Sequence, residues 1–223
     1  MIFNKPFKII KDIIKTTDLK RIINKKFSFY STNNTEELKE IYKLRYKVYC
    51  LEKKFIDCHL YNENMEFDGY DLNAIHLVVR DKRQNKLVGT LRLIRHSNKG
   101  LPIEKDFGLR MNLYKRKKSR VLEASRLVIL SDYRKKVIEE HLVLLALIKL
   151  VFNYCSQYNY NYLVAVVDNS PLVILQKLGL PIKILGKSKF YMGSESTPIL
   201  IDVKNGFLKL KKNKSVMWRF LKD

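Results

Sequence analysis

Charged side chains occupy positions that the apolar patterns of this sequence turn inward. Helical periodicity places Arg45 on one face with Leu38 and Ile41. In the alternating run Lys86–Arg95, Arg92 points to the same side as the apolar residues. A buried guanidinium needs a carboxylate partner, because removing one member of such a pair costs about 3–5 kcal/mol. The candidate partners are Glu66, Asp68, Asp71 and Glu123.

The chain is strongly basic, with 44 Lys and Arg against 22 Asp and Glu in 223 residues and a formal net charge of +22. This length suits one domain with one core. The charge favours an acidic partner, and nucleic acid, an anionic membrane surface and an acidic carrier protein all satisfy it. A bias toward lysine codons would also raise the charge, so composition does not choose among them.

Cysteine usage indicates a reducing compartment. Cys50, Cys58 and Cys155 are an odd set without a C-x-x-C pair, which favours free thiols and a cytoplasmic location. Cys58 and His59 can donate to a metal, but nothing at zinc spacing completes a site, so no metal is expected. No stretch approaches the roughly 20 apolar residues of a spanning helix, and residues 1–27 lack the pattern of a secretory signal.

Both ends of the chain are basic and amphipathic. We expect residues 1–26 to form a basic amphipathic arm that either docks on the domain or lies on a membrane. Residues 27–205 are expected to form the domain, and residues 206–223 a basic tail around the only tryptophan, Trp218. Such ends are compatible with peripheral contact at the inner membrane face.

Strand and helix patterns alternate between these ends. A strand at Phe27–Tyr30 precedes a helix over Thr35–Leu51, with Asn34 as its N-cap and Glu37 at capping-box spacing. The further expected elements are strands at Ala74–Arg80, Leu87–Ile94 and Val121–Leu130, a buried helix at Ile138–Cys155, a strand at Tyr162–Val167, a helix capped by Asn169 or Ser170 and ended by Gly179, and strands at Ile182–Tyr191 and Pro198–Val203. This order predicts an α/β or α+β fold with helices on the faces of a sheet.

Four short motifs lie between residues 36 and 135. They are Leu44-Arg45-x-x-Val48-Tyr49, Glu66-x-Asp68-x-x-Asp71, Gly89-Thr90-x-Arg92-Leu93 and Glu123-x-Ser125-Arg126. Their spacing resembles the acyl-homoserine-lactone (autoinducer) synthase superfamily. His76-Leu77 and Leu101-Pro102-Ile103-Glu104 make the chain more similar to the N-acyl amino acid synthases and exosortase-associated acyltransferases within it. The resemblance implies a GNAT-type acyltransferase fold, with a central mixed, mostly antiparallel sheet of about six to seven strands flanked by helices.

This resemblance implies attack of an amine on an acyl thioester, with Glu123, Ser125 and Arg126 as the catalytic residues. An amino acid's amine has a pKa near about 8 and is largely protonated at neutral pH, so a general base helps, and the resemblance gives that role to Glu123. Backbone N–H groups around residues 125–127 can stabilise the oxyanion if the strand bulges. An ideal strand puts Glu123 and Arg126 on opposite faces, which predicts a bulge or splay between them.

The expected substrate-binding residues are Arg45, Phe55, Glu66, Asp68, Asp71 and Arg92. Asp68 and Asp71 can hold a substrate ammonium or lock the inward-facing arginines in an ion-pair network, and we favour the network. An arginine left over would clamp a substrate carboxylate. Phe55 stands where autoinducer synthases carry a tryptophan, so the aromatic wall is kept and the indole donor is lost. The acyl chain is expected near Leu127, Ile129, Val164 and Val166.

The turn Ser131–Val137 indicates the acyl donor. Typical GNAT enzymes bind the pyrophosphate of coenzyme A with a glycine-rich loop at a helix N-terminus, and this turn contains no glycine. A basic turn suits the phosphopantetheine of an acidic acyl carrier protein, with Arg134, Lys135 and Lys136 as carrier contacts. Acyl-phosphopantetheine is then a substrate, and no permanently bound cofactor is expected.

Two rival functions stay open. An acyl-homoserine-lactone synthase would use S-adenosylmethionine, for which the sequence has no local signature. A non-catalytic basic module would bind nucleic acid or membrane instead. Nucleic acid is the less favoured partner, because aromatic and basic residues do not interleave in a stripe and phosphate binding does not need inward-facing charges.

Overall fold

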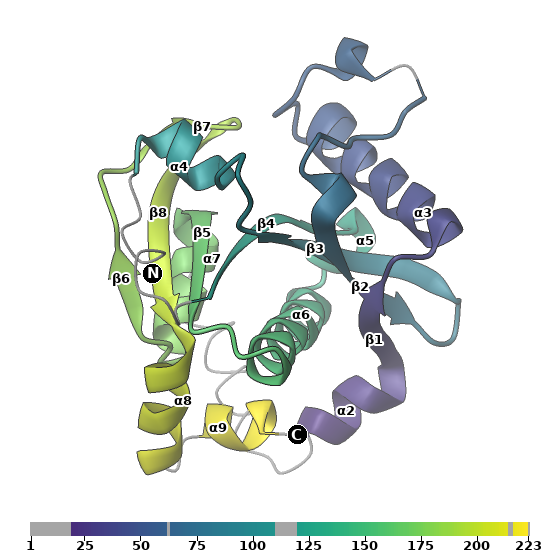
Figure 1. Cartoon of the computed structure of the whole chain (residues 1–223). Helices are drawn as coiled ribbons and strands as arrows, with labels where there is room; N and C mark the ends of the chain where they lie inside the picture. The colour runs from purple at the N-terminus through teal and green to yellow at the C-terminus, as the bar shows by residue number, and fades with distance from the viewer. Residues whose placement is uncertain (1–18, 62, 110–119, 214–215, 223) are drawn as a thin grey trace, which may run out of the picture.

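The computed structural model describes residues 19–61, 63–109, 120–213 and 216–222. Within these residues an eight-stranded sheet has the order β1-β2-β3-β4-β5-β8-β6, with β7 paired to β8. Neighbouring strands are antiparallel except β4 and β5, which are parallel. This mostly antiparallel sheet between helices (Figure 1) confirms the predicted GNAT-type acyltransferase fold.

The elements have the following bounds. The strands are β1 (Phe27–Thr32), β2 (Ala74–Asp81), β3 (Lys86–Arg95), β4 (Val121–Ile129), β5 (Tyr162–Asp168), β6 (Ile182–Ile184), β7 (Lys189–Tyr191) and β8 (Ser194–Asp202). The helices are α2 (Leu19–Lys26), α3 (Thr35–Tyr46), α4 (Pro102–Phe107), α5 (Ser131–Arg134), α6 (Val137–Gln157), α7 (Asn169–Lys177), α8 (Val203–Lys212) and α9 (Val216–Leu221), with the π-helix η1 (Lys47–Glu52) and the 3₁₀ turns η2 (Cys58–Leu60) and η3 (Asp71–Asn73).

Helix α6 covers one face of the sheet, and α3 lies against the opposite face (Figure 1). The run that predicts a buried helix is buried along most of α6, which packs on β1 to β4. Gly89 in β3 permits this close packing, because a side-chain carbon there would lie 2.5 Å from Cγ1 of Val143. The face toward α3 is left for the inward-pointing charges of β3 and β4.

Several elements differ from the sequence-based expectation: β8 begins at Ser194 and not at Pro198, and helix α4 was not predicted. The helix from Thr35, capped by Asn34 as predicted, is α-helical to Tyr46 and continues as the π-helix η1. Helix α7 begins at Asn169, so its N-cap is Asp168. Strands β6 and β7 replace the single strand expected over residues 182–191. Opposite the break between them, Pro198 of β8 accepts a hydrogen bond from Leu185, but it has no N–H to donate in return, so the ladder is interrupted there.

Residues 1–18 of the expected arm and residues 110–119 of the expected domain lie outside the described residues. The adjoining helix α2 packs on α6, and so do α8 and α9. The division into arm, domain and tail stays a prediction. Within the described ranges no helix is both long and apolar enough to cross a membrane, and the expected cytoplasmic location stays a prediction too.

Candidate functional site

Strand β4 separates from its neighbours where the catalytic candidates lie. Opposite Thr90–Arg92 of β3, the stretch Ser125–Val128 has one residue more than its partner, and Arg126 takes a φ of 52°. The parallel pairing of β4 with β5 ends at Ala124. The predicted bulge and splay are therefore both present, and beyond Ala124 the β5 side of this backbone faces a gap.

Six charged residues beside this gap form a closed ring in which arginines and carboxylates alternate. In order round the ring they are Arg45, Glu66, Arg126, Asp68, Arg92 and Asp71. Arg45 binds Asp71 through two hydrogen bonds of 2.7 and 3.1 Å. Arg92 donates over 2.7 Å to Asp68 and 2.8 Å to Asp71. Arg45 and Arg92 are both buried, as the sequence patterns predict.

The ring balances three positive charges with three negative ones. Burial alone would raise the pKa of Asp71, but the charge and hydrogen bonds of Arg45, with the charge of Arg92, outweigh burial and lower that pKa. Burial lowers the pKa of His76, whose Nε2 lies 3.7 Å from Asp71. The imidazole is thus neutral near pH 7 and adds no charge to the ring.

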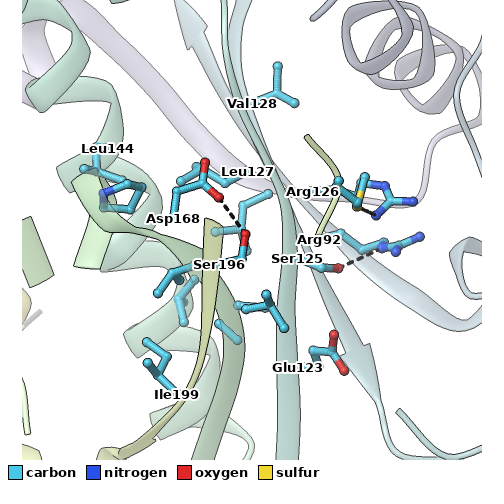
Figure 2. Close-up of a pocket in the computed structure, with 18 of the residues that line it drawn as sticks. Arg92, Glu123, Ser125, Arg126, Leu127, Val128, Leu144, Asp168, Ser196 and Ile199 are labelled. Atoms are coloured by element: carbon cyan, nitrogen blue, oxygen red, sulfur yellow. Dashed lines mark hydrogen bonds between the residues drawn. The ribbon is translucent and has the colours of Figure 1, made fainter. Parts of the chain in front are cut away.

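Only half of the ring faces the pocket. Asp68, Arg92 and Arg126 line it, while the other three members, also predicted to contact substrate, lie behind them and hold them by ion pairs. Arg92 also donates from Nε to Oγ of Ser125 over 3.1 Å, which fixes that hydroxyl (Figure 2). Each arginine of the ring has two carboxylate partners, so none remains free to clamp a substrate carboxylate.

Glu123 lies in the pocket wall on β4 and is almost fully buried. Its Oε2 accepts a hydrogen bond of 3.0 Å from the backbone N–H of Ile103. Burial raises the pKa of Glu123 to about 8, because this hydrogen bond and the charges of Arg92 and Arg126 offset only part of the desolvation. A carboxyl group that titrates near the pKa of an amine is suited to general base work at neutral pH.

The pocket has a volume of about 380 Å³ and joins this polar wall to an apolar interior. Apolar lining residues come from α6, α7, β5 and β8, and include Leu144, Ile148, Phe152, Leu175, Ile199 and Ile201. Of the expected acyl-chain residues, Leu127, Ile129 and Val166 line the pocket. Val164 instead belongs to a separate core cluster beneath α4. The volume is in the range of pockets for small organic ligands, about 300–1,000 Å³.

An aromatic wall closes the pocket beside Arg126. The π-helix η1 positions Tyr49, whose hydroxyl donates over 3.0 Å to the carbonyl of Leu127 on the bulged strand. The ring of Phe55 stacks on Tyr49 with 6.3 Å between centroids. Both residues line the pocket, so Phe55 supplies the aromatic wall that the sequence predicts.

The opposite wall holds polar residues that the sequence reasoning missed. Asp168 at the end of β5 accepts hydrogen bonds from Ser194 (2.7 Å) and Ser196 (3.1 Å) of β8, and Figure 2 shows it apart from the group around Arg92. Tyr191 of β7 donates to Asp106 of α4 over 2.7 Å. Two features of the sequence could have indicated this wall: the acidic Asp168 at the end of an apolar strand, and the serine-rich start of β8.

The expected carrier contacts lie in the turn between β4 and α6. Arg134 lines the pocket and forms an ion pair with Glu52 of η1. Lys135 and Lys136 are exposed beside it. The geometry therefore brings a basic surface next to the pocket without a glycine-rich phosphate loop.

One group in the described part of the chain offers metal-ligand types. Asp57, Cys58 and His59 have potential ligand atoms within 4.8 Å of one another. They do not line the pocket, and the Asp57 carboxylate already accepts the backbone N–H of His59 over 3.0 Å. Three adjacent, largely exposed ligands are not the closed tetrahedral set of a structural zinc site.

Three solved structures share this fold at low sequence identity. FeeM, an N-acyl amino acid synthase from uncultured soil microbes, has a TM-score of 0.62 and 14% identity, covering 84% of this chain and 96% of its own. The AHL synthase LasI has a TM-score of 0.59 and 20% identity, covering 79% and 89%. BjaI, a CoA-dependent acyl-homoserine lactone synthase, has a TM-score of 0.63 and 16% identity, covering 85% and 90%. No curated protein matches the chain in sequence.

The sheet that opens beside Glu123 is that of the GNAT-like acyltransferase fold. Residues 40–193, well over half of the chain, match the sequence model of a family described as N-acyl amino acid synthase FeeM. The chain belongs to this family.

Proposed function

We propose that this protein transfers a fatty acyl group from an acyl carrier protein thioester to the amine of an amino acid or a similar small amine. The observation that carries the proposal is Glu123, a buried carboxyl group with a pKa of about 8 in the wall of a pocket where β4 parts from β5. Family membership supports the reaction class.

In this proposal the phosphopantetheine arm enters the gap between β4 and β5. Its amide groups pair with the strand backbone beyond Ala124, which has no partner on β5. The acyl chain enters the apolar part of the pocket, lined from α6, α7 and β8. Burial of the acyl chain there would orient the thioester carbon toward the polar wall of the pocket.

The amine then attacks the thioester carbon. Ionised Glu123 takes the amine proton, directly or through a water molecule, as the C–N bond forms. Backbone N–H groups of the bulge at residues 125–127 would donate to the oxyanion. The C–S bond breaks when this intermediate collapses, and the departing thiolate takes the proton from Glu123, which returns the carboxylate to its starting state.

In this proposal one member of the six-residue ring contacts the amine, and the other members hold it in position. Asp68 is the ring carboxylate that lines the pocket, and its side chain is 29% exposed. We assign it to hold the amine before deprotonation, while Arg92 and Arg126 keep its two oxygens in place. Buried Arg45 behind them makes the ring rigid.

Acyl carrier protein is the proposed donor because of the surface beside the pocket. The turn Ser131–Lys136 is basic and glycine-free, and Lys135 and Lys136 are exposed. A net charge of +22 would steer an acidic carrier toward the enzyme. BjaI is CoA-dependent by its description, so coenzyme A thioesters are the necessary comparison.

A thiol-release assay tests the proposal. Purified protein receives acyl carrier or coenzyme A thioesters of several chain lengths, each with a panel of amino acids, and products are identified by mass spectrometry. We expect thiol release and an N-acyl amino acid with wild type and with Glu195→Gln, an exposed carboxylate outside the pocket lining. Glu123→Gln should lower the rate by about 10²–10⁴-fold. Absence of thiol release from every thioester would refute the proposed reaction.

A second candidate is acyl-homoserine-lactone synthesis, because LasI and BjaI share the fold. The same assay includes S-adenosylmethionine as the amine. A lactone product from that arm, without N-acyl amino acids from the others, would assign the protein to this second reaction.

A further inference from the structure

Three basic helices form one end of the molecule, where α2 from the start of the described chain meets α6 as do α8 and α9 from its end. Helices α2, α8 and α9 each pack on α6, and α8 also packs on α9. In Figure 1 they follow one another along the lower edge of the molecule, on the side away from α3. We call their outer surface the basic helical face.

This face is positively charged over its whole described extent. The three helices contain no acidic residue. The exposed basic residues of the helices and of the position after α9 are Lys20, Arg21, Lys25, Lys204, Lys209, Lys211, Lys212, Arg219 and Lys222. On α8 the helical spacing brings Lys204, Lys211 and Lys212 to one exposed stripe. Such a stripe attracts an anionic surface and not a neutral one.

Apolar side chains stand among these charges. Leu208 lies in the same stripe as Lys204 and Lys211, and it is 57% exposed. Ile22 of α2 is 40% exposed between Arg21 and the buried Ile23. Exposed apolar residues ringed by lysines are the pattern of a helix that lies in a bilayer interface, where long lysine stems reach the headgroups.

The helices are held firmly to the domain and are not loose appendages. Lys149, buried in the middle of α6, donates over 2.7 Å to the carbonyl of Phe220 near the end of α9. A cation at the last carbonyls of a helix stabilises its C-terminus. Met217, Phe220 and Leu221 are buried in the main core. The basic helical face therefore keeps a fixed shape.

A short aromatic chain links this face to the pocket. Phe152 of α6 lines the apolar part of the pocket, and its ring meets that of Phe207 of α8 at 5.1 Å between centroids. Phe207 in turn contacts Trp218 of α9 at 5.7 Å. These contacting rings thus connect the apolar lining of the pocket to helices α8 and α9.

We propose that the basic helical face docks the protein peripherally on an anionic phospholipid bilayer. Its lysines contact the phosphate headgroups, and Leu208 and Ile22 enter the interface. The charge alone would also suit a nucleic acid, but exposed aliphatic residues inside the stripe favour a surface with an apolar layer beneath its phosphates. The inference concerns binding and is independent of the proposed acyl transfer.

Vesicle sedimentation tests this proposal with the full chain. The probes are vesicles of phosphatidylcholine alone and vesicles with one third phosphatidylglycerol. The test variant is Lys204→Glu/Lys211→Glu/Lys212→Glu on α8. The control is Lys43→Glu/Lys47→Glu/Lys99→Glu, which makes the same charge change at exposed lysines outside the three helices. A second test variant, Leu208→Gln, removes the apolar contact and keeps the charge.

We expect wild type and control to bind the anionic vesicles, less strongly at higher salt, and to leave neutral vesicles unbound. The triple variant on α8 should bind at least about 100-fold more weakly, because each lysine at an anionic membrane contributes about fivefold. Leu208→Gln should weaken binding by about tenfold. Circular dichroism melting checks that each variant is folded.

Three results would overturn the proposal: equal binding to neutral and anionic vesicles, equal loss in the control and the α8 variant, or no vesicle binding by folded wild type. A parallel titration with single-stranded RNA identifies the competing partner. If RNA binding depends on the α8 lysines and is unaffected by Leu208→Gln while vesicles stay unbound, the face serves nucleic acid. Thiol release, measured separately with a short soluble thioester, shows whether acyl transfer succeeds or fails on its own.

Discussion

At the scale of single residues, the site contains carboxyl groups in two environments that shift their pKa values in opposite directions. Glu66 and Asp71 of the ring are buried beside arginines, and Asp71 stays ionised for that reason. Glu123 is buried and accepts a hydrogen bond from the backbone N–H of Ile103, and burial raises its pKa to about 8. Environments that push carboxyl pKa values apart separate the structural groups from the group that moves a proton.

The rate of acyl transfer should therefore depend steeply on pH. Below about pH 8 both Glu123 and the acceptor amine must lose a proton, so a logarithmic plot of kcat/KM against pH should approach a slope of two for wild type. Glu123→Gln should leave a slope of one, from the amine alone. Thiol release measured from about pH 6 to pH 9.5 gives both slopes, and identical profiles would remove Glu123 from the role of base.

The ionisation of Glu123 should affect stability in the opposite direction: the free energy of unfolding should fall as pH rises, while the rate of acyl transfer rises. Glu123 has a raised pKa of about 8 when folded against 4.5 as its ordinary value, so between these the folded protein binds more protons than the unfolded chain. The stability it contributes is complete below about pH 4.5 and is lost as pH rises through about 8.

From about pH 6 to pH 9 the loss should be roughly 2–3 kcal/mol, since a pKa difference of one corresponds to about 1.4 kcal/mol. Glu123→Gln keeps an acceptor for the N–H of Ile103 and does not titrate. Its unfolding free energy in urea should fall less over this range than that of wild type or of Glu195→Gln. Equal falls in all three proteins would contradict burial as the cause.

At the scale of elements, a bulged strand and a hairpin shape the pocket. The bulge in β4 frees backbone groups, and the β7–β8 hairpin brings Gly193 against the aromatic wall. A side-chain carbon at Gly193 would lie 2.2 Å from the ring of Phe55, and the residue has a φ of 80°. Any larger residue must displace either the hairpin or Phe55.

Gly193→Ala should consequently harm both stability and substrate binding. Gly108→Ala is a matched control, because Gly108 has a φ of 64° with nothing within 4 Å of an added carbon. Each substitution should cost about 1–2 kcal/mol for the left-handed backbone. Only Gly193→Ala should also raise the KM for the amine, by about tenfold, in steady-state thiol-release kinetics. Equal kinetics in the two variants would mean that the Phe55 wall does not touch the amine.

At the scale of the whole molecule, a net charge of +22 has two proposed uses on separate surfaces. The turn beside the pocket is assigned to the carrier, and the basic helical face to phospholipid. Separation of the two surfaces makes their effects separable by mutation.

Lys135→Glu/Lys136→Glu should lower kcat/KM for acyl carrier thioesters by about tenfold or more at low salt, chiefly through slower association. With a small acyl-pantetheine thioester, which has no carrier surface, kcat/KM should change little. Lys43→Glu/Lys47→Glu makes the same change in net charge elsewhere on the surface. Equal effects of the two double variants would indicate general steering without a defined carrier contact.

The sequence by itself determined the order of elements, the inward direction of Arg45 and Arg92, and the need for a bulge near Arg126. The first two features follow from local periodicity and from the cost of burying an unpaired charge. The bulge follows from the family resemblance, which gives catalytic roles to both Glu123 and Arg126 although an ideal strand would put them on opposite faces. The tertiary structure alone decided that six charges close into one ring, that Arg45 stands behind the pocket, and that Asp168 faces it. It also decided that α2, α8 and α9 share one face. Such relations depend on the packing of segments far apart in the chain, which no local pattern encodes.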